Sequence, residues 1–260
     1  MNSMNLIELG RITFDERESF RYLCNKFKDL SCPNCGKQQY YFMSRQRLRC
    51  KICGKDFNPL KSTKFSKIKI SASRWLVLVK LFELSVSARK ASVEMDMSYK
   101  TTLKAFDILR KVIAEELSKC NKDLKGEIEL DESYFGGKRK GLRGRGAAGK
   151  TIVFGILERG GKVSLEIVKN VTAETLMRET VKKVRRGSIV YTDKWRGYDS
   201  LMFSGYKHLN IDHRYKFILY LKEMEWRYNN RNEDLFEMLV YYMLARNELR
   251  INKISLSYNK

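Results

Sequence analysis

The sequence predicts a multidomain α/β protein, and three patterns along its 260 residues support this. Two C-x2-C pairs near the N-terminus indicate a small ribbon of strands held by a metal. Apolar residues repeat with helical spacing between about residues 73 and 110, and beyond Gly126 short runs typical of strands surround one helical segment. These patterns divide the chain into an N-terminal helical segment at 1–30, a ribbon at 31–58, a helical region at 59–120 and an α/β domain at 121–260.

The charge of the chain points to an anionic partner. Lys and Arg number 52 against 30 Asp and Glu, a net charge of +22 that attracts phosphate backbone or anionic lipid. No run approaches the roughly 18 apolar residues of a membrane span, and residues 1–27 mix acidic side chains into the hydrophobic ones, unlike a signal peptide. We therefore expect a cytoplasmic, nucleoid-associated protein whose partner is double-stranded DNA, with no membrane partner.

The ribbon at 31–58 carries the first candidate site. Its ligands are the thiols of Cys32, Cys35, Cys50 and Cys53. A glycine follows each pair, where the knuckle turn needs a positive φ, and segments 39–42 and 48–50 fit two antiparallel strands. Reduced cytosolic thiols favour Zn²⁺ over disulfides, and four thiolates leave no open position for water, so the zinc is expected to be structural. The isolated Cys24 and Cys120 are expected to be small buried hydrophobes.

The helical region has the outline of a helix-turn-helix. A helix at about 73–84, with Ser73 as its N-cap, precedes a short helix at 87–95, a turn at 96–97 and a second helix at 98–110. In such motifs the second helix enters the major groove. The residues then exposed to DNA are Ser98, Tyr99, Lys100, Thr101 and Lys104. The alternative is an ordinary helical hairpin, but the neighbouring ribbon and the positive charge favour DNA.

A second candidate DNA contact is the glycine-rich stretch at 136–146. It is too charged for a core, and we expect its basic side chains to lie on phosphates, a solvated loop being the alternative. These side chains are Lys138, Arg139, Lys140, Arg143 and Arg145.

Two aspartates mark the candidate catalytic centre. Strands are predicted at 127–135, 151–157, 162–168 and 188–193, with a hairpin turn at 160–161 and a helix at about 173–184. That order matches a ribonuclease H-like core, in which carboxylates at the ends of adjacent strands gather two divalent cations for phosphoryl transfer. Asp131 and Asp193 occupy those two places, so we predict a Mg²⁺ or Mn²⁺ site or the vestige of one. Alone, either aspartate could cap a turn.

Four segments in order carry a family resemblance. They are residues 131–141, 146–151, 191–198 and 220–231. Together they resemble DDE insertion-sequence transposases with an N-terminal zinc ribbon and an ISXO-like catalytic domain, over about Cys32 to Tyr242. The resemblance implies binding of terminal inverted repeats, Mg²⁺-dependent strand cleavage and transfer into target DNA, and a homodimer acting on paired ends. Asp131 and Asp193 match the family's first two metal ligands.

The chain departs from this family at the third ligand. Similar proteins carry a His-x-Asn-Gly-Ile-Glu-x-Phe-Trp segment on a helix, whereas this chain passes from His213 directly into the helix at 217–230. We therefore expect a truncated ribonuclease H-like α/β domain, shortened after about residue 213. Glu225 lies on the inward face of that helix and is the candidate third carboxylate. The alternative is a structural role, paired with Arg227, Arg231 or a backbone amide.

The missing segment leaves the activity of the chain open. An active transposase is expected if the active site is complete. The rival hypothesis is a catalytically defective remnant that binds DNA as a repressor or has no activity, and a third is a transcription regulator.

Overall fold

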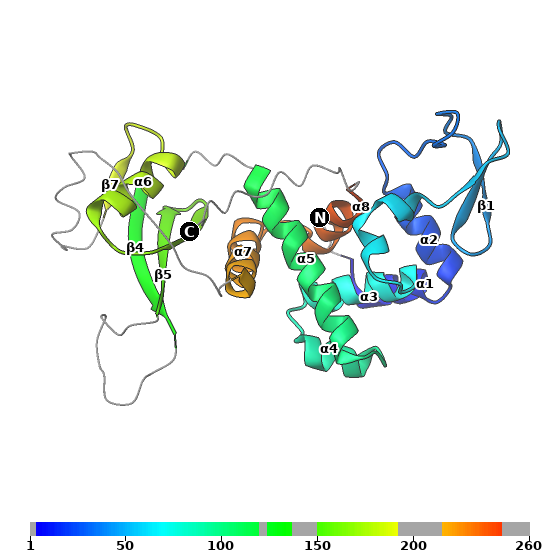
Figure 1. The fold of residues 1–260 in the computed structure, drawn as a ribbon, viewed down its shortest axis with the longest axis horizontal. Helices are drawn as coiled ribbons and strands as arrows, with labels where there is room; N and C mark the ends of the chain where they lie inside the picture. The colour runs from blue at the N-terminus through cyan, green and yellow to red at the C-terminus, as the bar shows by residue number, and fades with distance from the viewer. Residues whose placement is uncertain (1–3, 120–123, 137–149, 192–214, 246–260) are drawn as a thin grey trace. The chain divides into compact units, whose positions relative to one another are not determined.

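The computed structural model describes residues 4–119, 124–136, 150–191 and 215–245 of the chain (Figure 1). They form two compact units. The first, called the helical unit here, comprises Met1–Glu116 and Asn230–Ile251. The second, called the sheet unit, comprises Leu117–Asn229 and Asn252–Lys260. The division differs from the expected domain at 121–260, because a C-terminal segment belongs to the helical unit.

The helical unit has six helices and a small sheet in its described part. The helices are α1 (Leu6–Thr13), α2 (Glu16–Asn25), α3 (Ala72–Glu83), α4 (Ala88–Glu94), α5 (Tyr99–Lys119) and α8 (Leu235–Leu244). Two 3-10 turns, η1 (Pro59–Ser62) and η2 (Lys64–Lys67), precede α3. The sheet contains β1 (Tyr40–Met43), β2 (Arg47–Cys50) and β3 (Asp56–Phe57) in that order, all antiparallel. The two-residue β3 was not predicted.

The start of α3 corrects the predicted N-cap. Ser71 is the cap, since its side chain accepts a hydrogen bond from the amide of Arg74 at 3.2 Å. Ser73 lies inside the first turn, where its hydroxyl donates to Glu16 at 2.7 Å. The carboxylate of Glu16 also accepts from the backbone amides of Ala72 and Ser73. A carboxylate from α2 therefore satisfies amides at the start of α3, where the helix dipole favours negative charge.

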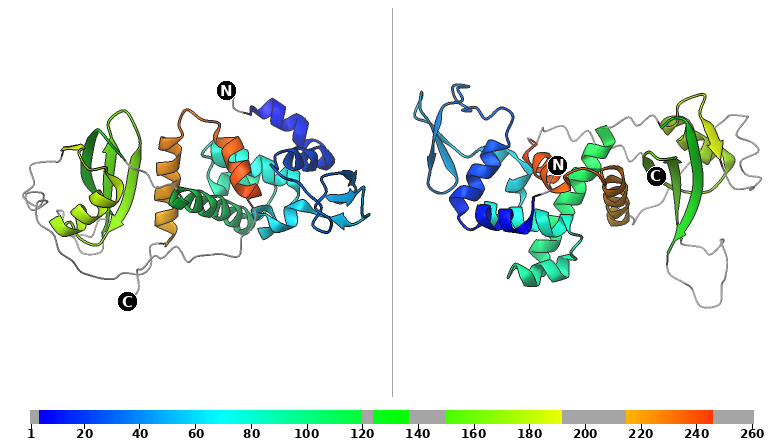
Figure 2. Two further views of the ribbon diagram at one scale, coloured as in Figure 1. Left: turned by 90° about the horizontal axis from the view of Figure 1, so that it is seen from above. Right: turned by 180° about the vertical axis from the view of Figure 1, so that it is seen from behind.

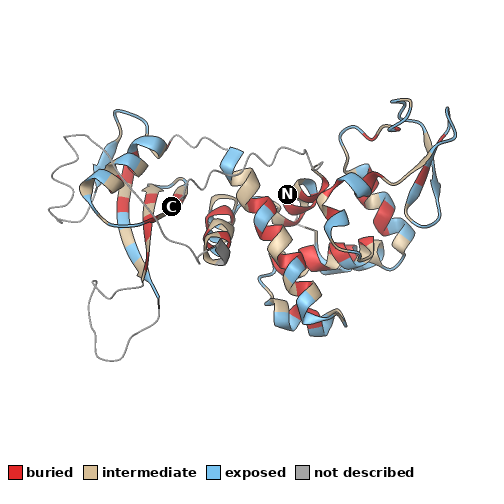
Figure 3. Cartoon of the chain, in the orientation of Figure 1, coloured by how far each residue is buried: buried red, intermediate tan, exposed pale blue. Residues whose placement is uncertain are grey.

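The core of the helical unit is built around α3, which packs against α8 as well as against α1 and α2 (Figure 3). The most deeply buried side chains of the two helices are Trp75, Leu76, Leu78, Val79 and Phe82 from α3, and Phe236, Leu239, Val240 and Met243 from α8. The indole of Trp75 donates to the carbonyl of Phe65 at 3.0 Å. Because α8 is apolar around most of its circumference, it requires burial on more than one side.

Polar contacts fix α8 in this position. Glu237 accepts a hydrogen bond from Tyr22 and forms an ion pair with Lys26 at 2.7 Å. Burial, followed by the hydrogen bond to Glu237, raises the pKa of Tyr22 far above its ordinary value. Lys80 of α3 lies over the ring of Phe236 at 5.8 Å. The C-terminal helix is thus an integral part of the helical unit.

Removal of a buried ring from α8 should destabilise the chain. Phe236 is fully buried, so Phe236→Ala leaves a cavity and should lower the free energy of unfolding by about 3–5 kcal/mol. The measurement is urea unfolding followed by circular dichroism. Phe14→Ala is the matched control, since Phe14 is 93% exposed and its loss should cost less than about 0.5 kcal/mol. Equal effects of the two substitutions would contradict the packing of α8.

The sheet unit contains one mixed sheet. Its strands are β4 (Glu127–Phe135), β5 (Thr151–Glu158), β6 (Val163–Val168) and β7 (Ile189–Tyr191), in the order β6-β5-β4-β7. Strand β5 pairs antiparallel with both β4 and β6, and β7 pairs with β4 in parallel. Gly160, with φ +69°, makes the predicted turn between β5 and β6. This strand order is consistent with a ribonuclease H-like region.

Two helices accompany the sheet (Figure 2). Helix α6 (Ala173–Lys183) covers one face, and helix α7 (Tyr215–Asn229) contacts β6. The buried cluster between α6 and the sheet contains Leu124, Ile128, Leu130, Phe154, Ile156, Val168 and, from α6 itself, Leu176. Residues 127, 129, 131, 133 and 135 of β4 point to the opposite face, because side chains alternate along a strand. The sheet therefore buries one face of β4 and leaves residues 127, 131, 133 and 135 of the other face exposed.

Candidate functional site

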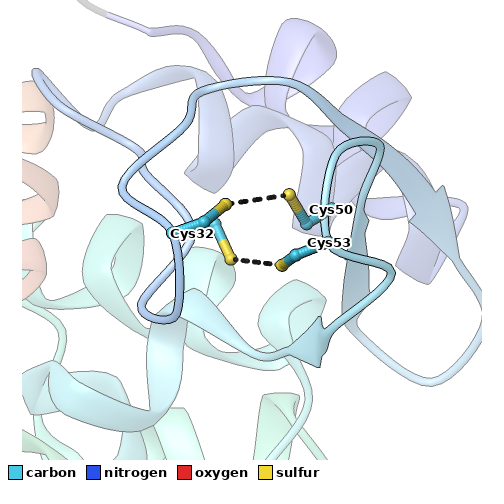
Figure 4. A group of neighbouring side chains, drawn as sticks. Cys32, Cys50 and Cys53 are labelled. Carbon is cyan, nitrogen blue, oxygen red and sulfur yellow. Dashed lines mark hydrogen bonds between the residues drawn. The ribbon is translucent and has the colours of Figure 1, made fainter.

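The four predicted cysteines meet in one cluster (Figure 4). Their sulfur atoms all lie within 4.8 Å of one another, and the Sγ–Sγ distances are 3.6 Å for Cys32–Cys53 and 3.5 Å for Cys35–Cys50. A tetrahedral zinc with bonds of about 2.3 Å places its sulfurs roughly 3.8 Å apart. The cluster therefore fits a structural zinc ion, and its residues are those that the sequence predicted.

Two equivalent turns build this cluster. In each, the first cysteine amide donates to the carbonyl five residues on, at 2.8 Å from Cys32 and 3.0 Å from Cys50. The glycine that follows each pair, Gly36 or Gly54, has φ near +70° and donates back to the first cysteine. A side chain at either glycine would be strained in this conformation. The predicted knuckle turns are therefore present.

The pKa values of the clustered thiols shift in opposite directions. The backbone amide of Lys55 lowers the pKa of Cys53 to about 6, although burial opposes the shift. For Cys35 the amide of Lys37 lowers the pKa, but burial and the neighbouring thiols outweigh it and raise the pKa to about 12. By contrast, burial alone raises the pKa of Cys24 to about 12, as expected of a small hydrophobe in the core. The predicted free thiol Cys120 lies outside the described residues.

The candidate DNA-reading helix is α5. It follows α4 after a turn in which Asp96 has φ +44°, and it runs to Lys119, nine residues beyond the predicted end at 110. Tyr99, Lys100 and Lys104 are exposed on its first turns, as is Ser98 immediately before it, and Thr101 is half-buried. Arg89 of α4 lies over the ring of Tyr99 at 5.6 Å. The structure thus leaves the predicted contact residues accessible to a nucleic acid.

Asp131 lies on the face of β4 that α6 does not cover. Its side chain is exposed, while its neighbour Leu130 is 4% exposed and points into the core. The carboxylate accepts a hydrogen bond from the amide of Glu132 at 2.9 Å. Among the described residues, no basic side chain lies within ion-pairing distance of it. This carboxylate is therefore accessible to a cation.

Several other predicted residues fall outside the described part of the chain. These are Asp193 and the basic side chains of Lys138, Arg139, Lys140, Arg143 and Arg145. The last described residue of β7 is Tyr191, which is paired in parallel with Glu129. Asp193 follows it by two positions in the sequence, as Asp131 follows Glu129.

Glu225 lies at the open edge of the sheet. Its side chain is buried, and its carboxylate accepts from the amide of Leu165 at 3.3 Å and from Lys222 at 2.8 Å. Lys222 also donates to the carbonyl of Leu165, and the amide of Asn229 bonds both the N–H and the C=O of Val163. Three side chains of α7 thus satisfy backbone groups of the edge strand β6.

Charge pairing accompanies this edge contact. Burial alone would lower the pKa of Lys222, but the carboxylates of Glu166 and Glu225 raise it above its ordinary value. Burial would raise the pKa of Glu166, but Lys222 and Lys183 lower it. Lys222 and Asn229 were not singled out from the sequence. Their spacing with Glu225 along one helix face was the available signal, but nothing in the sequence showed that this face meets a strand edge.

The comparisons with known proteins concern both units. The family described as the ISXO2-like transposase domain matches residues 123–217, which include Asp131 and Asp193 but not Glu225. An uncharacterized protein in transposable element ISH50 of Halobacterium salinarum is 29% identical over 193 residues, covering 65% of this chain and 64% of the relative. An uncharacterized transposase-like protein of Haemophilus influenzae is 34% identical over an alignment of 101 positions that covers 26% of this chain and 82% of the relative.

Two further findings complete the comparison. No solved structure matches the chain. No helix in its described part is both long and apolar enough to cross a membrane. The chain spans just under two thirds of the length of the ISH50 relative, at 64%.

Proposed function

Because this chain belongs to the family of transposases with an ISXO2-like DDE transposase domain, we propose that it binds the terminal inverted repeats of an insertion sequence and catalyses metal-dependent strand cleavage and transfer. The observation that carries the proposal is the family match over residues 123–217, which contains both candidate aspartates. Double-stranded DNA, as terminal repeats and as target, is the partner in this proposal. A homodimer would hold two paired ends.

The register between β4 and β7 supports Asp131 and Asp193 as the metal ligands. The parallel pairing runs Glu127 to Ile189 and Glu129 to Tyr191. Two residues further along each strand the sequence has Asp131 and Asp193, so a ladder that continued in the same register would bring two carboxylates together. Like-charged carboxylates on neighbouring strands are stabilised when they share a divalent cation.

The chemistry of the site follows from these ligands. Bound Mg²⁺ or Mn²⁺ stabilises the charge on the attacking and leaving oxygens of a phosphodiester. Asp131 contributes an exposed carboxylate and is paired with Gly155 in the β4–β5 ladder, so its backbone position does not depend on a loop. The side chains at the start of α5 and the basic stretch at 138–145 supply DNA contacts that would present the scissile bond to this centre.

A second function is favoured by the contacts of Glu225. Because this carboxylate already accepts from Leu165 and Lys222, it serves the edge of the sheet rather than an open metal site. A chain with only two metal-binding carboxylates would retain DNA through its helical unit without cutting it. Such a remnant would act as a repressor of an intact relative by occupying the same ends.

A labelled duplex that carries the element's terminal repeat separates the two functions. Incubation of the chain with this duplex and Mg²⁺ or Mn²⁺ should produce a nick at the element end if the transposase proposal holds. Retention of the duplex with no nick in either metal supports the repressor. An unrelated duplex of equal length is the control for sequence-independent binding, which falls steeply with salt.

Substitution of Glu225 tests its structural assignment. Glu225→Gln keeps an oxygen for the Leu165 amide but removes the charge beside half-buried Lys222, so we expect the free energy of unfolding to fall by about 1–3 kcal/mol. The maximal cleavage rate should remain within about threefold of the wild type. A third metal ligand would instead lose about 100-fold or more in rate with the sheet unit intact.

The neighbouring glutamate offers a matched control. Glu223 pairs with Arg227 on the same helix at 2.9 Å, so Glu223→Gln removes an i,i+4 ion pair worth about 0.3–0.5 kcal/mol. Unfolding is measured by urea titration, and cleavage is measured in the duplex assay at saturating Mn²⁺.

A further inference from the structure

Arg159 lies across the β4 face that carries Asp131, beside Glu127 and Glu129. Its backbone amide donates to the carbonyl of Glu127 at 2.9 Å, which fixes the residue next to β4 at the end of β5. Its guanidinium donates to Glu127 and to Glu129, each at 2.6 Å. Beyond them its Cζ lies 4.2 Å from the ring centroid of Tyr191 on β7. One side chain from the β5 end therefore contacts both β4 and β7.

These contacts change the charge on this face of β4. Glu127, Glu129 and Asp131 are alternate residues of the strand, so their side chains share one face at intervals of about 6.6 Å. Arg159 forms ion pairs with the first two. Asp131 is the third carboxylate of this row, and no basic side chain among the described residues pairs with it. Because Arg159 occupies the other two carboxylates, a divalent cation at Asp131 would have fewer competing ligands nearby.

The same side chain restrains the end of β7. This strand has three residues, all of them exposed, and its parallel pairing to β4 ends at Tyr191. So short an exposed strand has little buried area of its own to hold it. The guanidinium of Arg159, which two carboxylates of β4 hold in place, stacks on the ring of Tyr191. Arg159 therefore links the end of β7 to β4. The end of β7 is thus fixed at the point nearest Asp131 in the ladder.

We propose that Arg159 is a positioning residue for the Asp131 metal centre: it forms ion pairs with Glu127 and Glu129 and holds the end of β7 against β4. This inference rests on the proposed function, because it assigns a role toward the metal centre of that reaction. In this role Arg159 acts through Glu127, Glu129 and Tyr191, and contacts neither the metal nor the DNA.

Cleavage kinetics and metal binding test this role. In the terminal-repeat assay, Arg159→Ala should lower the maximal rate at saturating Mn²⁺ by at least about tenfold, since small misplacements of reacting groups are costly. Retention of the duplex and the urea unfolding midpoint should be unchanged. Arg159→Lys should give an intermediate rate, and Tyr191→Phe, which keeps the ring, should retain the wild-type rate.

A charge-restoring variant separates positioning from simple electrostatics. The double variant Arg159→Ala, Glu129→Gln removes one positive and one negative charge, so it keeps the local net charge. It lacks the contact to Tyr191, so its rate should stay low. Recovery of the wild-type rate in this variant would overturn the positioning role. Arg178 of α6 is equally exposed and pairs with one glutamate, so Arg178→Ala is the matched control and should cleave normally.

A binding measurement keeps this test independent of cleavage. Titration of the full chain with Mn²⁺, followed by electron paramagnetic resonance, measures the binding that Asp131→Asn abolishes. The double variant Arg159→Ala, Glu129→Gln should weaken that binding by about tenfold. If the wild-type chain binds Mn²⁺ at Asp131 but cuts no DNA, the transposase proposal fails. The Mn²⁺ affinities of the Arg159 variants still test the positioning role in that case. Equal Mn²⁺ binding in all chains, or no Asp131-dependent binding, would overturn the inference.

Discussion

Cys50→Ser should abolish zinc binding and, with it, the structure of the ribbon. The Cys50 thiol is buried and lies 3.5 Å from Cys35 in the four-sulfur cluster, so serine removes a ligand that no described neighbour can replace. Structural zinc contributes about 10–16 kcal/mol to small zinc-bound domains, far more than the three short strands could supply alone. Zinc content, measured by atomic absorption, should fall from one ion per chain to almost none.

The loss of zinc should also weaken DNA binding. Because the ribbon shares the helical unit with α5, we expect affinity for the terminal-repeat duplex to fall by at least about tenfold, or 1.4 kcal/mol. Cys24→Ala is the control, since Cys24 is a buried thiol outside the cluster, and this variant should keep its zinc. A Cys50→Ser chain that still holds one zinc ion and binds DNA normally would contradict the assignment.

Asp131→Asn should abolish cleavage while leaving the fold intact. The substitution removes the charge that a divalent cation requires, so the rate should fall by about 10²- to 10³-fold or more. The asparagine oxygen can still accept from the amide of Glu132, and the side chain is exposed, so the free energy of unfolding should change by less than about 0.5 kcal/mol. The duplex assay in Mn²⁺ measures the rate.

Ser133→Ala is the matched control for this substitution. Ser133 lies two residues further along the same exposed face of β4, so the variant alters the same surface without removing a carboxylate. It should cleave at the wild-type rate. Cleavage by Asp131→Asn at the wild-type rate would remove Asp131 from the metal centre.

Local patterns in the sequence predicted the elements that depend on local chemistry. The knuckle turns follow from cysteine spacing and from glycines that adopt positive φ, and all four sulfurs meet as predicted. Alternation of polar and apolar residues located β4 and its exposed Asp131, because one face of this strand is buried against α6. Such features require only neighbours in the sequence.

Features that depend on distant contacts were not predicted. Helix α8 belongs to the helical unit because its apolar surface and Glu237 find partners in α2 and α3, far away in the sequence. Ser71, and not the predicted Ser73, caps α3, because Glu16 of α2 binds the amides of the first turn. For Glu225 the sequence left a metal ligand and a structural role with a backbone amide open, but it could not name the partner, the amide of Leu165 on β6. In each case the deciding group lies on another element.

Diffraction from crystals grown with Mn²⁺ tests the metal centre most directly. The anomalous signal of manganese locates the ion without reference to activity. The account predicts an ion bound by the Asp131 carboxylate, with Asp193 as a second ligand from the adjacent strand. Density that places Asp193 away from Asp131, with manganese bound elsewhere or not at all, would contradict it.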